Sequence, residues 1–281
     1  MAQEEHATIM LIEDNPLTLR ILIEHLKKLG HQTAIARSAE EALRQIGMQK
    51  PDLILLDILL PGIDGFETCR RLKGNLATKD IPVIFLTALS QPEDKVKAFE
   101  VGGVDFLTKP VNFTEVSARI HTRLSIQKLQ RRLKTRSNVI SSGLVPHQNR
   151  KSVIMVVEDN PMTLQLLEKY LDGMGFHAIG TSSGEDALQA IESTQPDLIL
   201  LDVMLPGIDG FETCRLLKNS LQTRDIPVIF MTALSETQDK VKAFEAGAAD
   251  YITKPHHYAE IATRINTHLT LKTLQRQLKN A

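Results

Sequence analysis

The stretch that decides the fold is Pro51–Arg70, PDLILLDILLPGIDGFETCR, which recurs as PDLILLDVMLPGIDGFETCR at Pro196–Arg215. The two versions differ at two positions and begin 145 residues apart, at 51 and 196. The same offset relates further polar landmarks, namely Glu13-Asp14 with Glu158-Asp159, Thr87 with Thr232, and Lys109 with Lys254. A repeat this long indicates two copies of one domain and excludes a solenoid of short repeats.

Length, charge and composition narrow the class of protein. At about 150 residues per domain, 281 residues predict two domains. A net charge of −1 shows no excess of basic residues of the kind that binds nucleic acid or an anionic membrane. The apolar runs are far shorter than the roughly 20 residues of a membrane-spanning helix, and the N-terminus lacks a signal-peptide layout. Cys69 and Cys214 are equivalent in the two copies and are interpreted as buried free thiols. We therefore expect a cytoplasmic protein without nucleic-acid or membrane partners.

Short apolar runs alternate with helix-period segments in each copy. In the first copy the predicted strands are Thr8–Ile12, Gln32–Ala36, Leu53–Asp57, Val83–Leu86 and Val104–Leu107. This alternation predicts an α/β domain with a parallel sheet and helices on both faces. The uninterrupted run Leu53–Leu56 is typical of a central buried strand. Ser38 with Glu41 predicts a capping box at the start of the second helix. We expect two tandem doubly wound (βα)5 domains with strand order 2-1-3-4-5.

The expected domain limits are residues 1–125 for the first domain, 126–151 for a helical extension and linker, and 152–281 for the second domain with its own C-terminal helical extension. The last helix of each copy continues past its domain with apolar residues three and four apart, at Ile126, Leu129 and Leu133, and at Leu271, Leu274 and Leu278. This spacing fits either a heptad fragment or the frayed end of an amphipathic helix, and both readings stay open. The polar stretch after Lys134 is interpreted as a linker whose first part can still be helical.

Four polar landmarks follow the ends of predicted strands. Glu13 and Asp14 close the first strand, Asp57 the third, Thr87 the fourth and Lys109 the fifth. In an open parallel sheet these ends meet at one edge. Carboxylates 4 Å apart repel by about 4 kcal/mol per pair at an effective dielectric of 20, so the cluster must protonate or bind a cation. All-oxygen ligands favour Mg²⁺ or Mn²⁺ over zinc. A nucleophilic carboxylate beside a metal, an ammonium and a hydroxyl is suited to accepting a phosphoryl group.

Each landmark taken singly also has a plainer interpretation. Asp14 and Asp159 could cap the helices that follow them, and Asp57 could be a turn residue before Pro61-Gly62. Thr87 could simply favour a strand, and Lys109 could be a solvated charge. Their joint occurrence in two copies favours the shared site.

The motifs resemble those of the response-regulator receiver family of two-component signalling, and the resemblance covers almost the whole chain. The matching pieces are IEDNP and VEDNP, LLDILLPGIDG and LLDVMLPGIDG, FLTALS and FMTALS, and DFLTKP and DYITKP. One acidic pair would be weak evidence for the family, but four sequence motifs that occur in the same order in both copies are specific evidence for it. The resemblance implies a flavodoxin-like fold and cis peptide bonds before Pro110 and Pro255.

The resemblance also implies a role for each landmark. Asp57 and Asp202 would accept phosphate from a phosphohistidine of a sensor histidine kinase or a histidine phosphotransfer protein. Mg²⁺, or Mn²⁺, would be bound by side chains and by backbone carbonyls. Asp14 and Asp159 would bind the ion directly, and Glu13 and Glu158 would act mostly through water. The site would also include Asp57 and Asp202 and the backbone carbonyls of Leu59 and Met204. The phosphoryl oxygens would be contacted by Thr87, Thr232, Lys109 and Lys254. The switch aromatics would be Phe106 and Tyr251.

We expect a signalling module and not an enzyme, with chemistry confined to its own phosphorylation and dephosphorylation. Phosphorylation would change conformation and assembly. No run of residues resembles a DNA-recognition helix or a catalytic domain. Two alternatives stay open: the regulatory half of a longer effector, such as a diguanylate cyclase, and a phosphorelay intermediate or phosphate sink. Because the equivalent faces of the two copies are expected to be nearly the same, a homodimer, or pairing of the two receivers within one chain, also stays open.

The residues two positions beyond each phosphoacceptor (Leu59, Met204) and beyond each threonine (Leu89, Leu234) are all apolar. They should shield an acyl phosphate from attacking water, so self-dephosphorylation should be slow. The decay of the phosphorylated protein checks this, and a half-life of seconds in both domains would contradict it.

Overall fold

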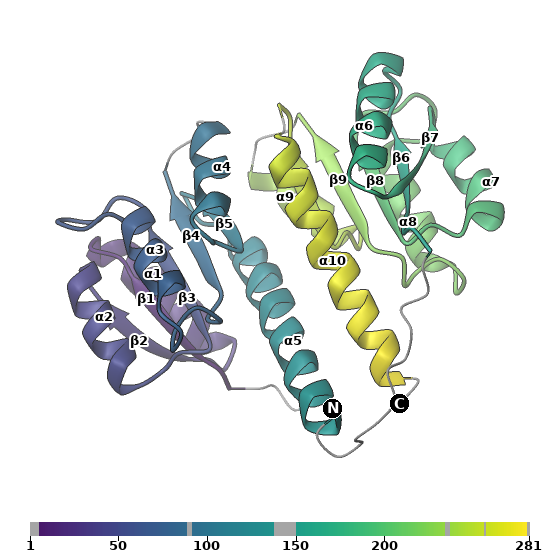
Figure 1. Ribbon diagram of the computed structural model, residues 1–281. Coiled ribbons are helices and arrows are strands. Elements are labelled where there is room, and N and C mark those ends of the chain that lie inside the picture. The colour runs from purple at the N-terminus through teal and green to yellow at the C-terminus, as the bar shows by residue number, and fades with distance from the viewer. Residues whose placement is uncertain (1–5, 89–91, 138–149, 234–236, 256, 280–281) are drawn as a thin grey trace. The chain divides into compact units, whose positions relative to one another are not determined.

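The structure is a computed structural model that describes residues 6–88, 92–137, 150–233, 237–255 and 257–279 (Figure 1). The chain divides into two compact units, residues 1–128 and 129–281. Each unit holds one α/β domain. The finer limits expected from the sequence stay predictions.

Strands and helices alternate through both domains. The first domain consists of β1 (Thr8–Ile12), α1 (Pro16–Lys28), β2 (Gln32–Ala36), α2 (Ala39–Met48), β3 (Leu53–Asp57), α3 (Gly65–Gly74), β4 (Val83–Thr87), α4 (Pro92–Glu100), β5 (Asp105–Thr108) and α5 (Phe113–Ser137). The second consists of β6 (Val153–Val157), α6 (Pro161–Gly173), β7 (His177–Thr181), α7 (Gly184–Thr194), β8 (Leu198–Asp202), α8 (Gly210–Asn219), β9 (Val228–Thr232), α9 (Thr237–Glu245), β10 (Asp250–Thr253) and α10 (Tyr258–Lys279).

Both sheets are parallel and have the predicted topology. The strand orders are β2-β1-β3-β4-β5 and β7-β6-β8-β9-β10. Strand β3 pairs with β1 on one side and with β4 on the other, so it lies at the centre, and its residues are all buried. The predicted strand ends were slightly wrong: β4 includes Thr87, and β5 begins at Asp105 and not at Val104.

Helices cover both faces of each sheet (Figure 1), and a layer of buried apolar side chains lies on each face. In the first domain, α1 and α5 pack on one face through residues such as Leu22 and Ile120. Helices α2, α3 and α4 pack on the other face through residues such as Ile46, Leu72 and Ala98. Burial of this apolar area is the main force that holds the helices to the sheet. Because the central strands β3 and β4 are buried along their whole length, their ends are what remains available for polar chemistry.

Local capping explains where the second helix begins. The Glu41 N–H donates to Ser38 Oγ over 3.2 Å, and Glu41 Oε2 accepts from the Arg37 N–H over 2.7 Å. The predicted reciprocal cap is therefore present, although the carboxylate reaches one residue further back than in a standard capping box.

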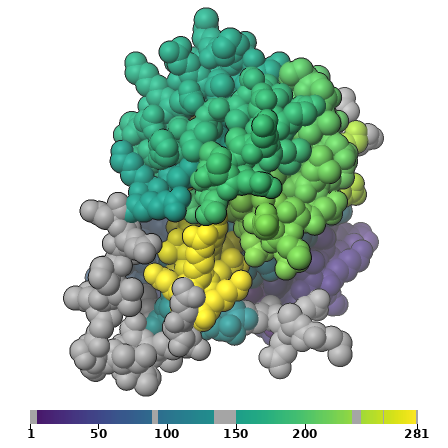
Figure 2. All heavy atoms as spheres, turned by 90° about the vertical axis from the view of Figure 1, so that its right-hand side faces the viewer, coloured from purple at the N-terminus to yellow at the C-terminus, as the bar shows by residue number. Residues whose placement is uncertain are grey.

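The last helix of each domain is long, as predicted. Helix α5 has 25 residues and α10 has 22, and α5 continues to Ser137, inside the stretch interpreted as a linker. In Figure 2 the last turns of α10, in yellow, emerge below the green body of the second domain. The heptad interpretation of these extensions stays a prediction. Among the helices in the described part of the chain, none is both long and apolar enough to cross a membrane.

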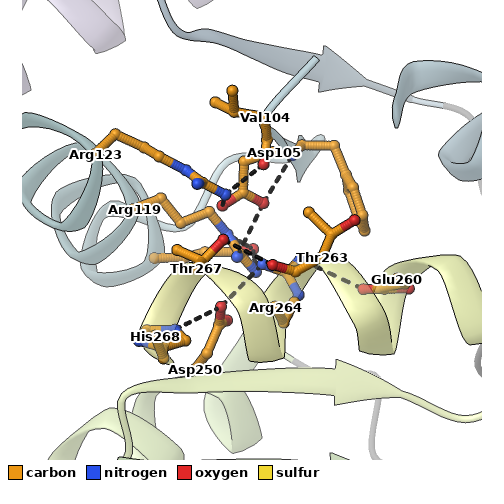
Figure 3. A network of polar contacts seen from close by, with 12 residues as sticks. Val104, Asp105, Arg119, Arg123, Asp250, Glu260, Thr263, Arg264, Thr267 and His268 are labelled. Atoms are coloured by element: carbon orange, nitrogen blue, oxygen red, sulfur yellow. Dashed lines mark hydrogen bonds and ion pairs between the residues drawn. The ribbon is translucent and has the colours of Figure 1, made fainter. Parts of the chain in front are cut away.

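Ion pairs tie the last helix to the last strand in each domain (Figure 3). In the first domain Arg119 lies 3.1 Å from Asp105 of β5, and Arg123 lies 3.4 Å from the same carboxylate. In the second domain Arg264 lies 3.0 Å from Asp250 of β10, and His268 takes the place of Arg123 at 3.3 Å from Asp250. An arginine–aspartate ion pair is thus common to the two domains, and a second side chain, Arg123 or His268, contacts the same aspartate.

Helix α3 begins in close contact with the strand that precedes it. The Gly65 N–H donates to the Ile58 carbonyl over 2.9 Å. A Cβ at Gly65 would lie 2.2 Å from the Asp57 carbonyl oxygen, and at Gly210 it would lie 2.1 Å from that of Asp202. Glycine is therefore required at both positions for α3 and α8 to start where they do.

Gly65→Ala should lower the free energy of unfolding by about 1–3 kcal/mol, because the backbone must move to admit the methyl group. Gly47→Ala, inside α2 where a Cβ meets nothing within 4 Å, is the matched control and should raise that free energy by about 0.5–1 kcal/mol. Urea denaturation followed by circular dichroism measures both. Equal effects of the two substitutions would contradict the steric argument.

Candidate functional site

The polar landmarks of the first domain meet at the carboxyl edge of its sheet. Glu13 and Asp14 directly follow β1, Asp57 is the last residue of β3, Thr87 the last of β4, and Lys109 directly follows β5. Because β3 lies between β1 and β4, these residues come from adjacent strand ends. The second domain repeats the arrangement with Glu158, Asp159, Asp202, Thr232 and Lys254.

Three carboxylates crowd together in each domain. Oxygens of Glu13, Asp14 and Asp57 all lie within 4.8 Å of one another, as do those of Glu158, Asp159 and Asp202. Glu13 and Asp57 are buried, whereas Asp14 is exposed. An all-oxygen cluster with one solvent-facing member fits a hard divalent cation that keeps several waters, as Mg²⁺ does.

A lysine bridges the two buried carboxylates. Lys109 Nζ lies 2.6 Å from Glu13 Oε2 and 2.7 Å from Asp57 Oδ2. Lys254 Nζ lies 2.7 Å from Glu158 Oε2 and 2.6 Å from Asp202 Oδ2. The ammonium offsets part of the repulsion that the sequence led us to expect, between the two buried carboxylates.

The electrostatics of the cluster follow from burial and from this bridge. Burial raises the pKa of Glu13 above its ordinary value, and the charge of Asp57 adds to the shift, although the bond to Lys109 opposes it. Glu158 has a raised pKa for the same main reason. Burial alone would lower the pKa of Lys109, but its hydrogen bonds to Asp57 and Glu13 hold that pKa above its ordinary value.

The backbone around the site rules out the capping role considered for Asp14. Helix α1 is capped by Asn15, whose Oδ1 accepts from the Leu17 and Thr18 N–H groups at 2.9 and 3.1 Å. Asn160 caps α6 in the same way. Asn15 also donates its N–H to Glu13 Oε1 over 3.2 Å. Asp14 is thus left with its carboxylate exposed at the rim of the cluster.

The phosphoacceptor candidates are held by their own loops. Asp57 Oδ1 accepts from the Leu59 N–H at 3.3 Å, and Asp202 Oδ1 from the Met204 N–H at 3.1 Å. The Leu59 and Met204 residues are exposed, at 59% and 64%. Leu89 and Leu234, the other predicted shielding residues, lie outside the described residues.

The threonine and aromatic candidates line the same side of the domain. Thr87 and Thr232 are buried at the ends of their strands. The Phe106 ring is buried against Phe99, with ring centres 5.9 Å apart, and Tyr251 packs against Phe244 at 6.0 Å. Both aromatics already point into the core in this structure. The peptide bonds before Pro110 and Pro255 are cis, as the resemblance implied.

One pair of residues near the site was not predicted from the sequence. Glu40 of α2 lies close to the loop after β3, and Glu185 of α7 contacts the loop after β8, and no motif pointed to either residue. Cys69 and Cys214 are buried free thiols, as predicted, and burial raises the pKa of each to about 11.

The chain is similar in sequence to known proteins. The family described as "Response regulator receiver domain" matches residues 9–121 and 154–266. Response regulator PleD of Caulobacter vibrioides is 30% identical over 98% of this chain, and the chain spans 61% of that protein. The alkaline phosphatase synthesis transcriptional regulatory protein PhoP of Bacillus subtilis is 42% identical over 41% of this chain and 48% of its own length. The solved BeF3-activated N-terminal receiver domain of Klebsiella pneumoniae RstA is 35% identical, covers 42% of this chain and 98% of its own, and has a TM-score of 0.40.

Lys109→Gln should lower the free energy of unfolding of the first domain by about 1–3 kcal/mol at pH 7, because it leaves two buried carboxylates without their cation. The loss should shrink at pH 5, since the raised pKa of Glu13 lets that carboxyl group take up a proton and remove the repulsion. Urea denaturation at the two pH values measures this. Lys50→Gln, on an exposed lysine, is the control. An equal loss at both pH values would show that the bridge does not act electrostatically.

Proposed function

The chain belongs to the response regulator receiver family, and we propose that Asp57 and Asp202 accept a phosphoryl group from a phosphohistidine. Receiver domains are signalling modules of two-component systems and generally interact with histidine kinases or phosphotransfer proteins. The observation that carries the proposal is the lysine-bridged carboxylate cluster, present at the same sheet edge in both domains.

The proposed reaction is an in-line transfer. A carboxylate oxygen of Asp57 attacks phosphorus, the P–N bond of the phosphohistidine breaks, and the leaving imidazole takes up a proton on that nitrogen. The Thr87 hydroxyl donates a hydrogen bond to an arriving phosphoryl oxygen and keeps its proton, and the Lys109 ammonium pairs with another oxygen. Mg²⁺, or Mn²⁺, bound by Asp14 and Asp57 would offset the negative charge of the phosphoryl group. Glu13 would contribute through water, and the Leu59 carbonyl would complete the metal site. The counterparts in the second domain take the same roles.

Lys109 would change its partner when Asp57 is phosphorylated. Before transfer it bridges Glu13 and Asp57, and afterwards the new phosphoryl dianion competes for its ammonium. Hydrogen bonds to charged groups contribute about 1.5–3 kcal/mol each. Two of them, from Thr87 and Lys109, would supply part of the ~5.5 kcal/mol that inverts a 1:99 equilibrium, because Lys109 gives up contacts with the carboxylates to make its bond. The change would be read on the face formed by α4, β5 and α5, where Phe106 lies.

We place the protein in the cytoplasm and assign it no catalytic activity beyond its own phosphorylation and dephosphorylation. A longer effector, such as a diguanylate cyclase, is the second candidate, because the chain spans 61% of its Caulobacter relative. A phosphorelay role stays open as well. Homodimer formation, or pairing of the two receivers within one chain, stays a prediction.

Acetyl phosphate with Mg²⁺ should add one phosphoryl group at each intact aspartate. Intact-mass measurement should give two groups on the wild-type chain, one on Asp57→Ala or Asp202→Ala, and none on the double variant. Size measured on the same samples reports any change of assembly. A wild-type chain that gains no mass, or a double variant that gains as much as the wild type, would disprove the assignment.

A further inference from the structure

The loop between β3 and α3, and its counterpart between β8 and α8, connects the phosphoacceptor to the next helix. It begins at Asp57 and ends at Asp64, whose Oδ1 caps α3 by accepting from the Glu67 N–H at 2.7 Å. The loop also carries Leu59, whose carbonyl is the proposed metal ligand. Whatever fixes this loop therefore also fixes the phosphoacceptor and one metal ligand.

A glutamate from a different helix holds the loop from outside. In the second domain the Ile208 N–H donates to Glu185 Oε1 over 3.0 Å. Glu185 stands in the first turn of α7, and its side chain is otherwise exposed. Helix α7 contributes no other residue to the site described above. A hydrogen bond from an N–H group to an ionised carboxylate is stronger than one between neutral groups.

The first domain has a similar approach. Glu40 of α2 lies against Gly62. The pKa of Glu40 is lowered, first by its own backbone N–H, then by the Ser38 side chain, with a smaller contribution from the Ile63 backbone. The carboxylate is therefore ionised, and available as an acceptor, at neutral pH.

The loop has a glycine where the carboxylate approaches. Gly62 has φ +79° and Gly207 has φ +76°, which L side chains rarely adopt. A Cβ at Gly62 would lie 3.3 Å from Glu40 Oε1, and at Gly207 it would lie 2.3 Å from Glu185 Oε1. The Glu185 carboxylate therefore occupies the space that a Cβ at Gly207 would need, whereas at Gly62 the approach of Glu40 is close but does not exclude a Cβ.

We propose that Glu40 and Glu185 are positioning residues, which hold the loop after the phosphoacceptor in the shape that takes Mg²⁺ and the phosphoryl group. The inference rests on the proposed function. The glutamate does not touch the reacting atoms and acts through the backbone of the loop. Partners that orient metal ligands commonly change metal affinity by 10- to 100-fold, and an exposed partner should have a smaller effect.

The competing role is simple stabilisation of the helix, because an acidic residue in the first turn favours the positive end of the helix dipole. The neighbour Asp186 separates the two roles. It stands in the same turn of α7, is also exposed, and bonds Ser182 Oγ at 3.2 Å instead of the loop. Asp186→Ala removes the same charge from the same turn, and it is the matched control.

The test uses the full chain with Asp57→Ala, so that the second site dominates Mg²⁺ binding. Mg²⁺ affinity is measured by titration calorimetry, and exchange of the Ile208 amide hydrogen is measured without metal. Glu185→Ala should weaken Mg²⁺ binding by about threefold to tenfold and speed exchange at Ile208, because one charge-assisted hydrogen bond is lost. Glu185→Gln keeps an acceptor oxygen and should restore most of both values. Asp186→Ala should leave both unchanged.

Three results would overturn the inference: wild-type affinity in Glu185→Ala, an equal loss in Asp186→Ala, or no rescue by Glu185→Gln, which would indicate a long-range charge effect. A wild-type chain that takes neither Mg²⁺ nor phosphate overturns the proposed function and this inference with it. A wild-type chain that takes both, beside an unaffected Glu185→Ala, overturns the inference alone.

Discussion

The close approach of buried carboxylates at one sheet edge is the constraint on which the rest of the structure depends. Glu13 and Asp57 would repel each other strongly at that distance, and the ammonium of Lys109 offsets their charge. The bridge forms only because β1, β3 and β5 are parallel and end at the same edge. The neighbouring helices begin close to this bridge. Asn15, which carries no charge, caps α1, and Gly65 allows α3 to begin in contact with the end of β3.

The two domains share this chemistry but differ around it. The Lys–carboxylate distances agree within 0.1 Å between the copies. In contrast, the stacked ring pair between the first and last helices is His25–Phe113 in one domain and Tyr170–Tyr258 in the other. A cluster of buried charges tolerates little change, because an unpaired charge is costly to bury. The helix surfaces carry no such penalty, so they tolerate the differences between the two domains.

The sequence predicted the sheet, its order and the converging landmarks because these depend on short-range patterns. The apolar run Leu53–Leu56 marks a central strand, and the polar residues that follow each strand mark its carboxyl end. Strand limits were predicted less well: β5 begins at Asp105 and not at Val104, since propensity changes gradually at a strand end whereas hydrogen bonding stops abruptly. Asp14 was an equally good capping candidate by residue type, and only the backbone geometry gave that role to Asn15.

By itself, then, the sequence determined that the chain is a duplicated α/β receiver with two complete sets of acidic, hydroxyl and ammonium groups. Which partner each group takes was decided only by the tertiary structure. Lys109 bridges two carboxylates, and Glu185 reaches across to the Ile208 amide, because elements distant in the chain bring these atoms within hydrogen-bonding distance. Local patterns record which face or strand end a residue occupies, but a directional contact depends on separations of tenths of an ångström that only packing sets.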